Sequence, residues 1–285
     1  MIISAPAKIN LFLEVGPPQQ GFHPLISFVD IISFQDKIEI EKVKKNSVTF
    51  ISDWEIPEQN SVSESLKLLK NKCALQGEFD IKVFKNIPPG SGLGGGSSNA
   101  ATVMKVLLKD CKIKPNEREF LDLAALIGKD VPLFISGKRA IIEGFGEQVK
   151  DVKTIEPLFY NLFIPNFPVS TKSVYMNMDR MGVKGDLTKA SEKIKMILSL
   201  VNNSNISNLE KLLENRLSES CYNLYPKIKE VKNSLERSTG KRIFLSGSGG
   251  TLFAIYKTKK EAEEKAEEVT VKGWKSLVAC SVTTS

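Results

Sequence analysis

Strand-like hydrophobic runs, separated by polar and turn residues, dominate the first half of the chain. Runs rich in β-branched and aromatic residues, with turn residues between them, predict five strands. These strands cover residues 9–15, 26–34, 36–43, 47–52 and 79–86. Apolar residues at helical spacing predict three helices in the same half of the chain. The helices cover residues 61–75, 97–111 and 117–128, and a strand with a turn follows over 140–146.

The pattern changes near Pro157, after which helical periodicity is more frequent. A strand with a proline-containing loop is predicted over 158–171, two strands around a glycine turn over 241–256, and a last strand over 274–282. Helices are predicted over 187–201, 206–217, 225–238 and 259–269. We therefore expect an α+β protein of two domains, residues 1–153 and 154–285.

Composition narrows the class of protein without identifying its chemistry. The 285 residues are 41% hydrophobic and 26% charged, as in ordinary globular proteins. A net charge of +7 favours anionic partners, and both phosphorylated metabolites and nucleic acid fit it. The lysines and arginines are spread along the chain without the aromatic–basic clusters of single-strand binders, which argues against nucleic acid.

The N-terminal segment and the cysteines point to the cytoplasm. The first fifteen residues are apolar but are interrupted by Lys8 and lack a basic region, so they predict a strand rather than a signal peptide. No run approaches the length of a membrane span. The four cysteines are far apart and form no CxxC pair, which argues against a structural zinc site or a disulfide framework.

A glycine-rich stretch, "PPGSGLGGGSSNAA" at 88–101, carries the clearest chemical signal. Each ordered glycine costs about 0.5–1 kcal/mol, so this density needs a reason. Glycines that lead into a helix expose amide N–H groups at the positive end of the helix dipole, a site suited to a polyphosphate. The alternative is a tight turn with Ser97 and Ser98 as helix caps. The number of glycines favours phosphate binding.

Three other nucleotide motifs fit poorly. "GSGLGG" at 90–95 matches GxGxxG, but two prolines separate it from the strand and Asp110 ends a helix rather than a second strand. Arginine follows both Gly-Lys pairs where a Walker A loop requires Ser or Thr. The HRD and DFG elements of protein kinases are absent from the sequence.

Three stretches together resemble the motifs of the GHMP kinase superfamily, which includes galactokinase, homoserine kinase, mevalonate kinase and phosphomevalonate kinase. They are "SAPAKINLFLEV" at 4–15, the glycine stretch, and "LSGSGGTLFAIY" at 245–256. "GFH", "GKDVPLF" and "STKSVY" resemble the members whose acceptor is a cytidine diphosphate derivative of methylerythritol. The resemblance covers essentially the whole chain. It implies a two-domain α+β GHMP kinase fold with the active site in a cleft, an N-terminal domain like one of a ribosomal protein, and a C-terminal domain related to the ferredoxin-like fold.

The resemblance implies ATP-dependent phosphorylation of the 2-hydroxyl of the erythritol unit in the non-mevalonate isoprenoid pathway, with Mg²⁺ assisting. Homoserine or mevalonate kinase activity is the alternative. The phosphate loop would comprise Pro89, Gly90, Ser91, Gly92, Leu93, Gly94, Gly95, Gly96, Ser97 and Ser98. No carboxylate stands out as a Mg²⁺ ligand. We expect a monomer or weak homodimer that acts on a small molecule, without a nucleic-acid or membrane partner.

Two residues are implied as the catalytic pair. Taken alone, Asp130 in "GKDVP" is predicted to be a capping acid before Pro132. The resemblance implies instead that Asp130 is the base that accepts the proton of the substrate hydroxyl. Lys8 lies within an apolar strand, where a lysine extending to solvent at a strand edge is the ordinary interpretation. The resemblance pairs Lys8 with Asp130 instead.

The acceptor site is implied at five residues, Asn10, Phe22, His23, Thr171 and Tyr175. His23, the only histidine, would hydrogen-bond the cytosine, and Tyr175 would cover one face of the base. Phe22 replaces the usual tyrosine, and Pro24 stands where an acidic residue is common. These departures concern the cytidine side of the site rather than the ATP side.

Overall fold

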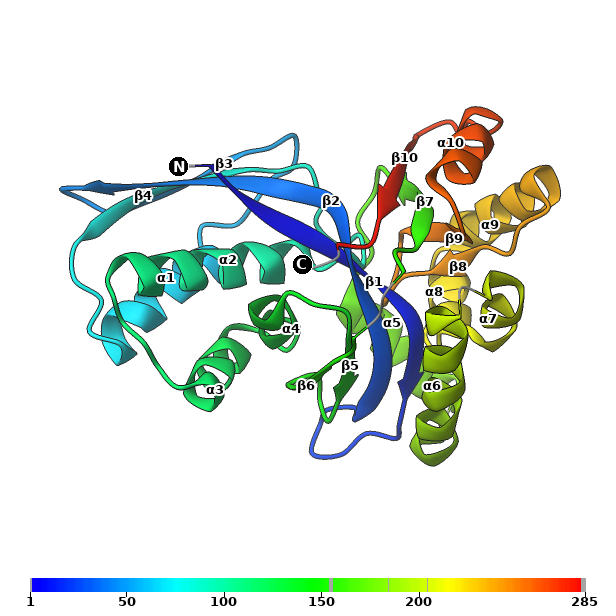
Figure 1. The fold of residues 1–285 in the computed structure, drawn as a ribbon, viewed down its shortest axis with the longest axis horizontal. Helices are drawn as coiled ribbons and strands as arrows, with labels where there is room; N and C mark the ends of the chain where they lie inside the picture. The colour runs from blue at the N-terminus through cyan, green and yellow to red at the C-terminus, as the bar shows by residue number, and fades with distance from the viewer. Residues whose placement is uncertain (1, 154–155, 184, 204, 283–285) are drawn as a thin grey trace.

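The structure is a computed structural model that describes residues 2–153, 156–183, 185–203 and 205–282. It contains two β-sheets that lie side by side, with helices around each (Figure 1). The expected boundary between residues 153 and 154 falls beside residues 154–155, which lie outside the described residues. No helix in the described ranges combines the length and the apolar character needed to cross a bilayer.

The first sheet has the strand order β3-β4-β2-β5-β6, and β1 also pairs with β2. Its strands are β1 (Ile2–Val15), β2 (Leu25–Val43), β3 (Ser47–Ile51), β4 (Glu78–Phe84), β5 (Ala140–Glu143) and β6 (Gln148–Asp151). The two strands expected at 26–34 and 36–43 form one strand, β2. The polar residue at their junction, Asp36, is fully buried and accepts hydrogen bonds from the backbone amides of Asn86 and Ile87 at 2.7 and 2.8 Å. Because its carboxylate is satisfied, Asp36 does not interrupt the strand.

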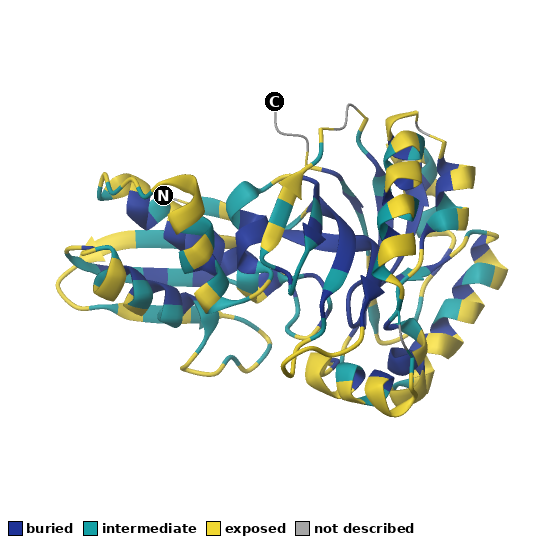
Figure 2. Cartoon of the chain, turned by 90° about the horizontal axis from the view of Figure 1, so that it is seen from below, coloured by how far each residue is buried: buried dark blue, intermediate teal, exposed yellow. Residues whose placement is uncertain are grey.

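The second sheet has the order β10-β7-β9-β8. Its strands are β7 (Phe159–Pro165), β8 (Phe244–Leu245), β9 (Leu252–Tyr256) and β10 (Trp274–Cys280). Successive residues of β9 pack on opposite faces of the sheet. Phe253 packs with residues of the first sheet, and Leu252 packs with the outer helices. Both faces of this sheet are therefore covered, which explains its nearly continuous apolar strands. Buried residues concentrate in the strands where the two sheets meet (Figure 2).

Ten helices are assigned among the described residues. They are α1 (Ser61–Lys72), α2 (Gly95–Asp110), α3 (Glu117–Ile127), α4 (Val131–Ser136), α5 (Thr171–Arg180), α6 (Leu187–Asn202), α7 (Ile206–Leu212), α8 (Ser218–Leu224), α9 (Pro226–Thr239) and α10 (Lys259–Glu267). The sequence patterns did not predict α4, α5 and α8. In α5, Ser170 caps the first turn, and Val174 and Met178 form a narrow buried stripe. So short a stripe gives little periodic signal.

A buried polar network joins the two sheets. The guanidinium of Arg139 donates to both carboxylate oxygens of Asp30 on β2, at 2.9 and 2.8 Å. Tyr160 on β7 and Ser281 after β10 also donate to Asp30, at 2.5 and 2.6 Å. Burial, reinforced by the negative charge of Asp30, raises the pKa of Tyr160 well above its usual value, so the phenol stays protonated and donates.

Removing Asp30 should therefore destabilise the protein. Asp30→Ala leaves Arg139 buried without its carboxylate, which costs about 3–5 kcal/mol in comparable buried pairs. The free energy of unfolding in urea measures the loss. Glu230→Ala is the matched control, because its pair with Lys227 is exposed and such pairs contribute about 0–1 kcal/mol. Equal small effects of both substitutions would contradict a stabilising role for the network.

Candidate active-site cavity

Almost every residue expected at the site lines one cavity of about 1000 Å³. Strand β1, the loop before β2, the glycine stretch, the α3–α4 junction, α5 and the 246–250 turn all contribute to its lining. The expected residues that line it are Lys8, Asn10, Phe22, His23, Pro89, Gly90, Ser91, Gly92, Gly94, Gly95, Gly96, Ser97, Asp130, Thr171 and Tyr175. Leu93 and Ser98 do not line the cavity, because both side chains are buried in the interior.

The glycine stretch enters α2 earlier than expected. The helix begins at Gly95, with Gly94 as its N-cap at φ 72° and no side-chain cap, so Ser97 and Ser98 are helical residues rather than caps. In the described part of the chain, the backbone amides of Gly94, Gly95, Gly96 and Ser97 donate to no other protein group. These consecutive N–H groups lie at the positive end of the α2 dipole and can bind an anion.

The glycines are also required by close packing within the protein. A Cβ atom at Gly92 would lie 2.3 Å from the carbonyl oxygen of Ser246, and the residue has φ +77°. A Cβ at Gly94 would lie 2.9 Å from the ring of Phe134. The hydroxyl of Ser246 donates to the Gly92 carbonyl at 3.0 Å, and the amide of Lys8 donates to the Leu93 carbonyl at 2.9 Å. These contacts fix the glycine stretch against both β1 and the 246–250 turn.

Lys8 and Asp130 meet in the cavity as expected. Their Nζ and Oδ2 atoms are 3.6 Å apart, and the side chain of Lys8 is buried whereas that of Asp130 is 41% exposed. Lys8 also donates to Asn10 Oδ1 at 2.5 Å. Asp130 is the N-cap residue of α4, but its side chain makes no capping hydrogen bond. Its carboxylate is therefore available to a ligand rather than committed to the helix.

Tyr175 and His23 form the aromatic part of the opposite side of the cavity. Their ring centroids are 5.4 Å apart with a tilt of 43°. Ring nitrogen Nδ1 of His23 lies 3.0 Å from the Gly16 carbonyl oxygen, and Nε2 lies 3.2 Å from Asp179 Oδ2. Burial, and secondly the negative charge of Asp130, raise the pKa of Tyr175 well above its usual value. Its phenol is therefore neutral, and its ring can stack against a planar ligand.

Phe22 and Thr171 lie at the margins of this aromatic region. Phe22 is 60% exposed, and its ring centroid lies 6.2 Å from that of Phe145, near the ammonium of Lys129 at 5.8 Å. The hydroxyl of Thr171 lies 2.8 Å from that of Ser248 in the 246–250 turn. Phe22 can cover a ligand from the solvent side, and Thr171 can contact it where α5 meets the turn.

A second buried acid supports the glycine stretch and was not identified from the sequence. Asp36 pairs with Lys85, and the amide of Asn99 on α2 donates to Asp36 Oδ2 at 2.9 Å. Lys85 also lines the cavity. Burial lowers the pKa of Lys85, and the nearby charge of Asp36 opposes that shift. One signal for the Asp36–Lys85 pair was present in the sequence, namely the position of Asp36 within an apolar strand pattern.

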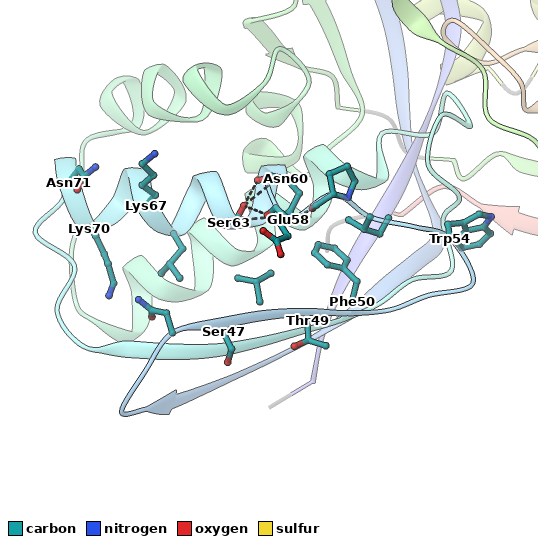
Figure 3. Close-up of a pocket in the computed structure, with 15 residues that line it drawn as sticks. Ser47, Thr49, Phe50, Trp54, Glu58, Asn60, Ser63, Lys67, Lys70 and Asn71 are labelled. Atoms are coloured by element: carbon teal, nitrogen blue, oxygen red, sulfur yellow. Dashed lines mark hydrogen bonds between the residues drawn. The ribbon is translucent and has the colours of Figure 1, made fainter.

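A shallower hollow of about 760 Å³ lies between α1 and β3 (Figure 3). It shares Phe50, Ile56, Pro57 and Asn60 with the main cavity, so the two are adjacent. Asn60 Oδ1 accepts from the amide of Ser63 at 3.0 Å and caps α1. The start of α1 lies beside the glycine stretch, because the hydroxyl of Ser61 donates to the Gly96 carbonyl at 2.8 Å.

The cavity offers few ligands for a metal ion. No group of three or more His, Cys, Asp or Glu side chains within the described ranges could hold an ion. Ser97 and Asp130 line the same cavity as the glycines with free amides, and each carries a side-chain oxygen. Such a set fits Mg²⁺, which binds few protein oxygens and keeps phosphate oxygens and waters as its other ligands.

Two family descriptions match the chain. Residues 60–138 match "GHMP kinases N terminal domain", and residues 197–275 match "GHMP kinases C terminal". Of the solved structures, a 4-(cytidine 5'-diphospho)-2C-methyl-D-erythritol kinase superposes with a TM-score of 0.80 at 27% identity, covering 99% of this chain and 100% of that one. These findings confirm the expected two-domain fold.

Relatives of known name cover nearly the whole chain. A 4-diphosphocytidyl-2-C-methyl-D-erythritol kinase of Persephonella marina is 36% identical over 280 residues, which are 97% of each chain. One of Carboxydothermus hydrogenoformans is 32% identical over 280 residues, which are 98% of this chain and 96% of the relative. A homoserine kinase of Cytophaga hutchinsonii has a TM-score of 0.73 at 16% identity, covering 99% of this chain and 93% of that one, a likeness of fold alone.

Gly92 and Gly96 provide a direct test of the packing argument. Gly92→Ala should lower the free energy of unfolding by more than about 1 kcal/mol, because its positive φ and the Ser246 carbonyl both exclude a Cβ. Gly96→Ala is the matched control, because its Cβ would meet only the Ser61 hydroxyl at 3.4 Å. Urea unfolding compares the two variants. A Gly92→Ala protein as stable as the wild type would show that the loop can move away from the turn.

Proposed function

The chain belongs to the GHMP kinase family, and we propose that it transfers the γ-phosphoryl group of ATP to the 2-hydroxyl of 4-diphosphocytidyl-2-C-methyl-D-erythritol, a step of the non-mevalonate isoprenoid pathway. Relatives of that name align over almost all of both chains. The observation that carries the proposal is one cavity with free amides at α2, the Lys8–Asp130 pair and an aromatic wall at Tyr175.

The free amides at the start of α2 bind the phosphates of ATP in this proposal. They are fixed in place before ligand binds, so no reorganisation is needed as charge develops on the transferred group. The cavity continues from there to Phe50, Ile56 and Pro57, which provide an apolar surface for the adenine. Mg²⁺, held by phosphate oxygens with Ser97 and Asp130 nearby, would neutralise phosphate charge.

Asp130 accepts the proton of the acceptor hydroxyl. The hydroxyl oxygen forms a bond to the γ-phosphorus, the bond from that phosphorus to the bridging oxygen breaks, and ADP leaves with the electron pair. The ammonium of Lys8, 3.6 Å from the Asp130 carboxylate, stabilises negative charge at the attacking oxygen. Asn10 accepts a hydrogen bond from Lys8 and so orients it.

The cytidine end of the acceptor lies against Tyr175 in this proposal, with Phe22 on the solvent side. Base-on-aromatic stacking contributes about 1–3 kcal/mol, and Tyr175 is neutral and partly buried. Asn10 and Thr171 offer polar contacts between the base and the reacting hydroxyl. We further propose a cytoplasmic monomer or weak homodimer, which sedimentation of the purified protein would test.

An assay of ADP release tests the function directly. ATP with the cytidine substrate should give turnover, and homoserine or mevalonate in its place should not, because neither has a planar base to stack on Tyr175. Turnover with homoserine or mevalonate, and none with the cytidine compound, would assign the chain to another branch of the family.

Replacing the proposed base should affect catalysis rather than nucleotide binding. We expect Asp130→Asn to lower kcat by about 10²–10⁴, the usual contribution of general-base assistance. Its affinity for ATP should change little, because the amides of α2 are untouched. Steady-state kinetics and a nucleotide titration measure the two quantities, with Asp122→Asn on the exposed surface of α3 as the control. Full activity of Asp130→Asn would remove this carboxylate from the mechanism.

Removing the aromatic wall should weaken acceptor binding selectively. Tyr175→Ala should raise KM for the cytidine substrate by about 5- to 150-fold, the equivalent of losing one stacked base, and leave KM for ATP nearly unchanged. Tyr175→Phe keeps the ring and should stay within a few-fold of the wild type, about 0.5 kcal/mol. Equal increases in both KM values after Tyr175→Ala would show that Tyr175 serves packing alone.

A further inference from the structure

We propose that Ser248, in the 246–250 turn, binds the diphosphate of the acceptor together with Thr171. The inference rests on the proposed cytidine substrate and concerns the part of it that neither Tyr175 nor Asp130 contacts. That substrate carries a diphosphate between its base and the hydroxyl that is phosphorylated. A subsite for the diphosphate should therefore lie between the aromatic wall and the catalytic pair, in the cavity that Ser248 lines.

A short series of contacts joins the aromatic wall to the turn. Thr171 and Tyr175 are four residues apart on α5, so their side chains lie on the same face of the helix, one turn from each other. The hydroxyl oxygen of Thr171 lies 2.8 Å from that of Ser248. Ser248 is therefore within one helical turn of the surface on which the base is proposed to stack.

The same turn reaches the catalytic pair on its other side. Gly247 packs so closely against β1 that a Cβ atom there would lie 3.2 Å from Asn10 Oδ1 and 3.4 Å from Lys8 Nζ. Lys8 Nζ is in turn 3.6 Å from Asp130 Oδ2. The turn thus extends from the catalytic pair to α5, which is the interval that the diphosphate of a bound acceptor occupies.

The turn offers hydrogen-bond donors that the protein itself does not use. One hydroxyl of the Thr171–Ser248 pair donates to the other, so one hydroxyl hydrogen is left without an acceptor among the described residues. Within the same ranges, the backbone amides of Gly247 and Ser248 donate to no protein group. The charged oxygens of a diphosphate accept such bonds, and Ser248 is only 7% exposed, so its hydroxyl is held in place before the ligand binds.

A positive charge lies next to the two hydroxyls. Lys172 follows Thr171 on α5, lines the cavity and is exposed. Its ammonium forms no ion pair with a carboxylate in the part of the chain that the structure describes. An exposed charge attracts an anion but is screened by salt, so Lys172 assists binding without fixing its geometry. The buried hydroxyl of Ser248 sets the position of the diphosphate.

Calorimetric titration can compare a ligand that has the diphosphate with one that lacks it. The protein is first saturated with ADP, so that CDP reports the acceptor end of the cavity, and cytidine is measured by its competition with CDP. Ser248→Ala should weaken CDP binding by about 10- to 150-fold, the usual value of a hydrogen bond to a charged group, and leave cytidine binding unchanged. Ser234→Ala, at an exposed position of α9, is the matched control and should bind both ligands as the wild type does.

A second variant gives the same comparison if Ser248→Ala is unstable. Thr171→Val removes the other hydroxyl of the pair at an exposed position of α5, where a change of side chain is tolerated more easily. It should also weaken CDP binding and leave cytidine binding unchanged. The free energy of unfolding in urea, measured for each variant, shows whether the fold is intact.

The other outcomes would each overturn the proposal. Unchanged CDP affinity in Ser248→Ala, or a wild type that binds CDP no more tightly than cytidine, would exclude a diphosphate subsite at the turn. Equal losses of CDP and cytidine would mean that Ser248 only packs against α5. A loss of ADP binding instead would assign the turn to the phosphates of ATP. Failure of the proposed function is a separate result, namely no ADP release by the wild type, because the titrations need no turnover.

Discussion

The close approach of the glycine stretch to the 246–250 turn is the contact on which the site depends. Gly92 lies so near the Ser246 carbonyl that no side chain fits between them, and the hydroxyl of Ser246 bonds back to Gly92. The turn belongs to the second sheet and the stretch to the first. This contact therefore brings the free amides of α2, Lys8 on β1 and the start of α5 around one cavity.

Buried charges hold the surroundings of that contact rigid. Asp36 binds Lys85 and two backbone amides under the glycine stretch, and Asp30 joins β2 to β7 through Tyr160. Both acids are satisfied, since a carboxylate buried without partners would be strongly destabilising. The partly exposed acids of the cavity, Asp130 and Asp179, differ from them. Each keeps a carboxylate oxygen available to a ligand. The structural acids, Asp30 and Asp36, are therefore buried with all their hydrogen bonds made, whereas the cavity acids are partly exposed and can still accept one.

The sequence predicted most of the fold and the location of the site, for physical reasons that also explain what it missed. Long elements with clear periodicity, such as α2 and α6, were predicted, because many residues contribute to their patterns. The short helices α4 and α5 were missed, because each buries only a few residues. Residue type and family resemblance identified Asp130 and Tyr175, whereas Asp179 gave no signal until α5 placed it one turn from Tyr175.

The two ends of the cavity recognise their ligands by different physics. At α2, backbone amides bind charge wherever a phosphate presents oxygens, and they are indifferent to what the phosphate carries. At α5, the Tyr175 ring accepts any planar base. Neither surface can select one nucleotide, so selectivity has to come from a polar side chain whose own position is fixed. The His23–Asp179 pair is such a fixed polar group at this end of the cavity, because Nε2 of the buried His23 ring lies 3.2 Å from Asp179 Oδ2.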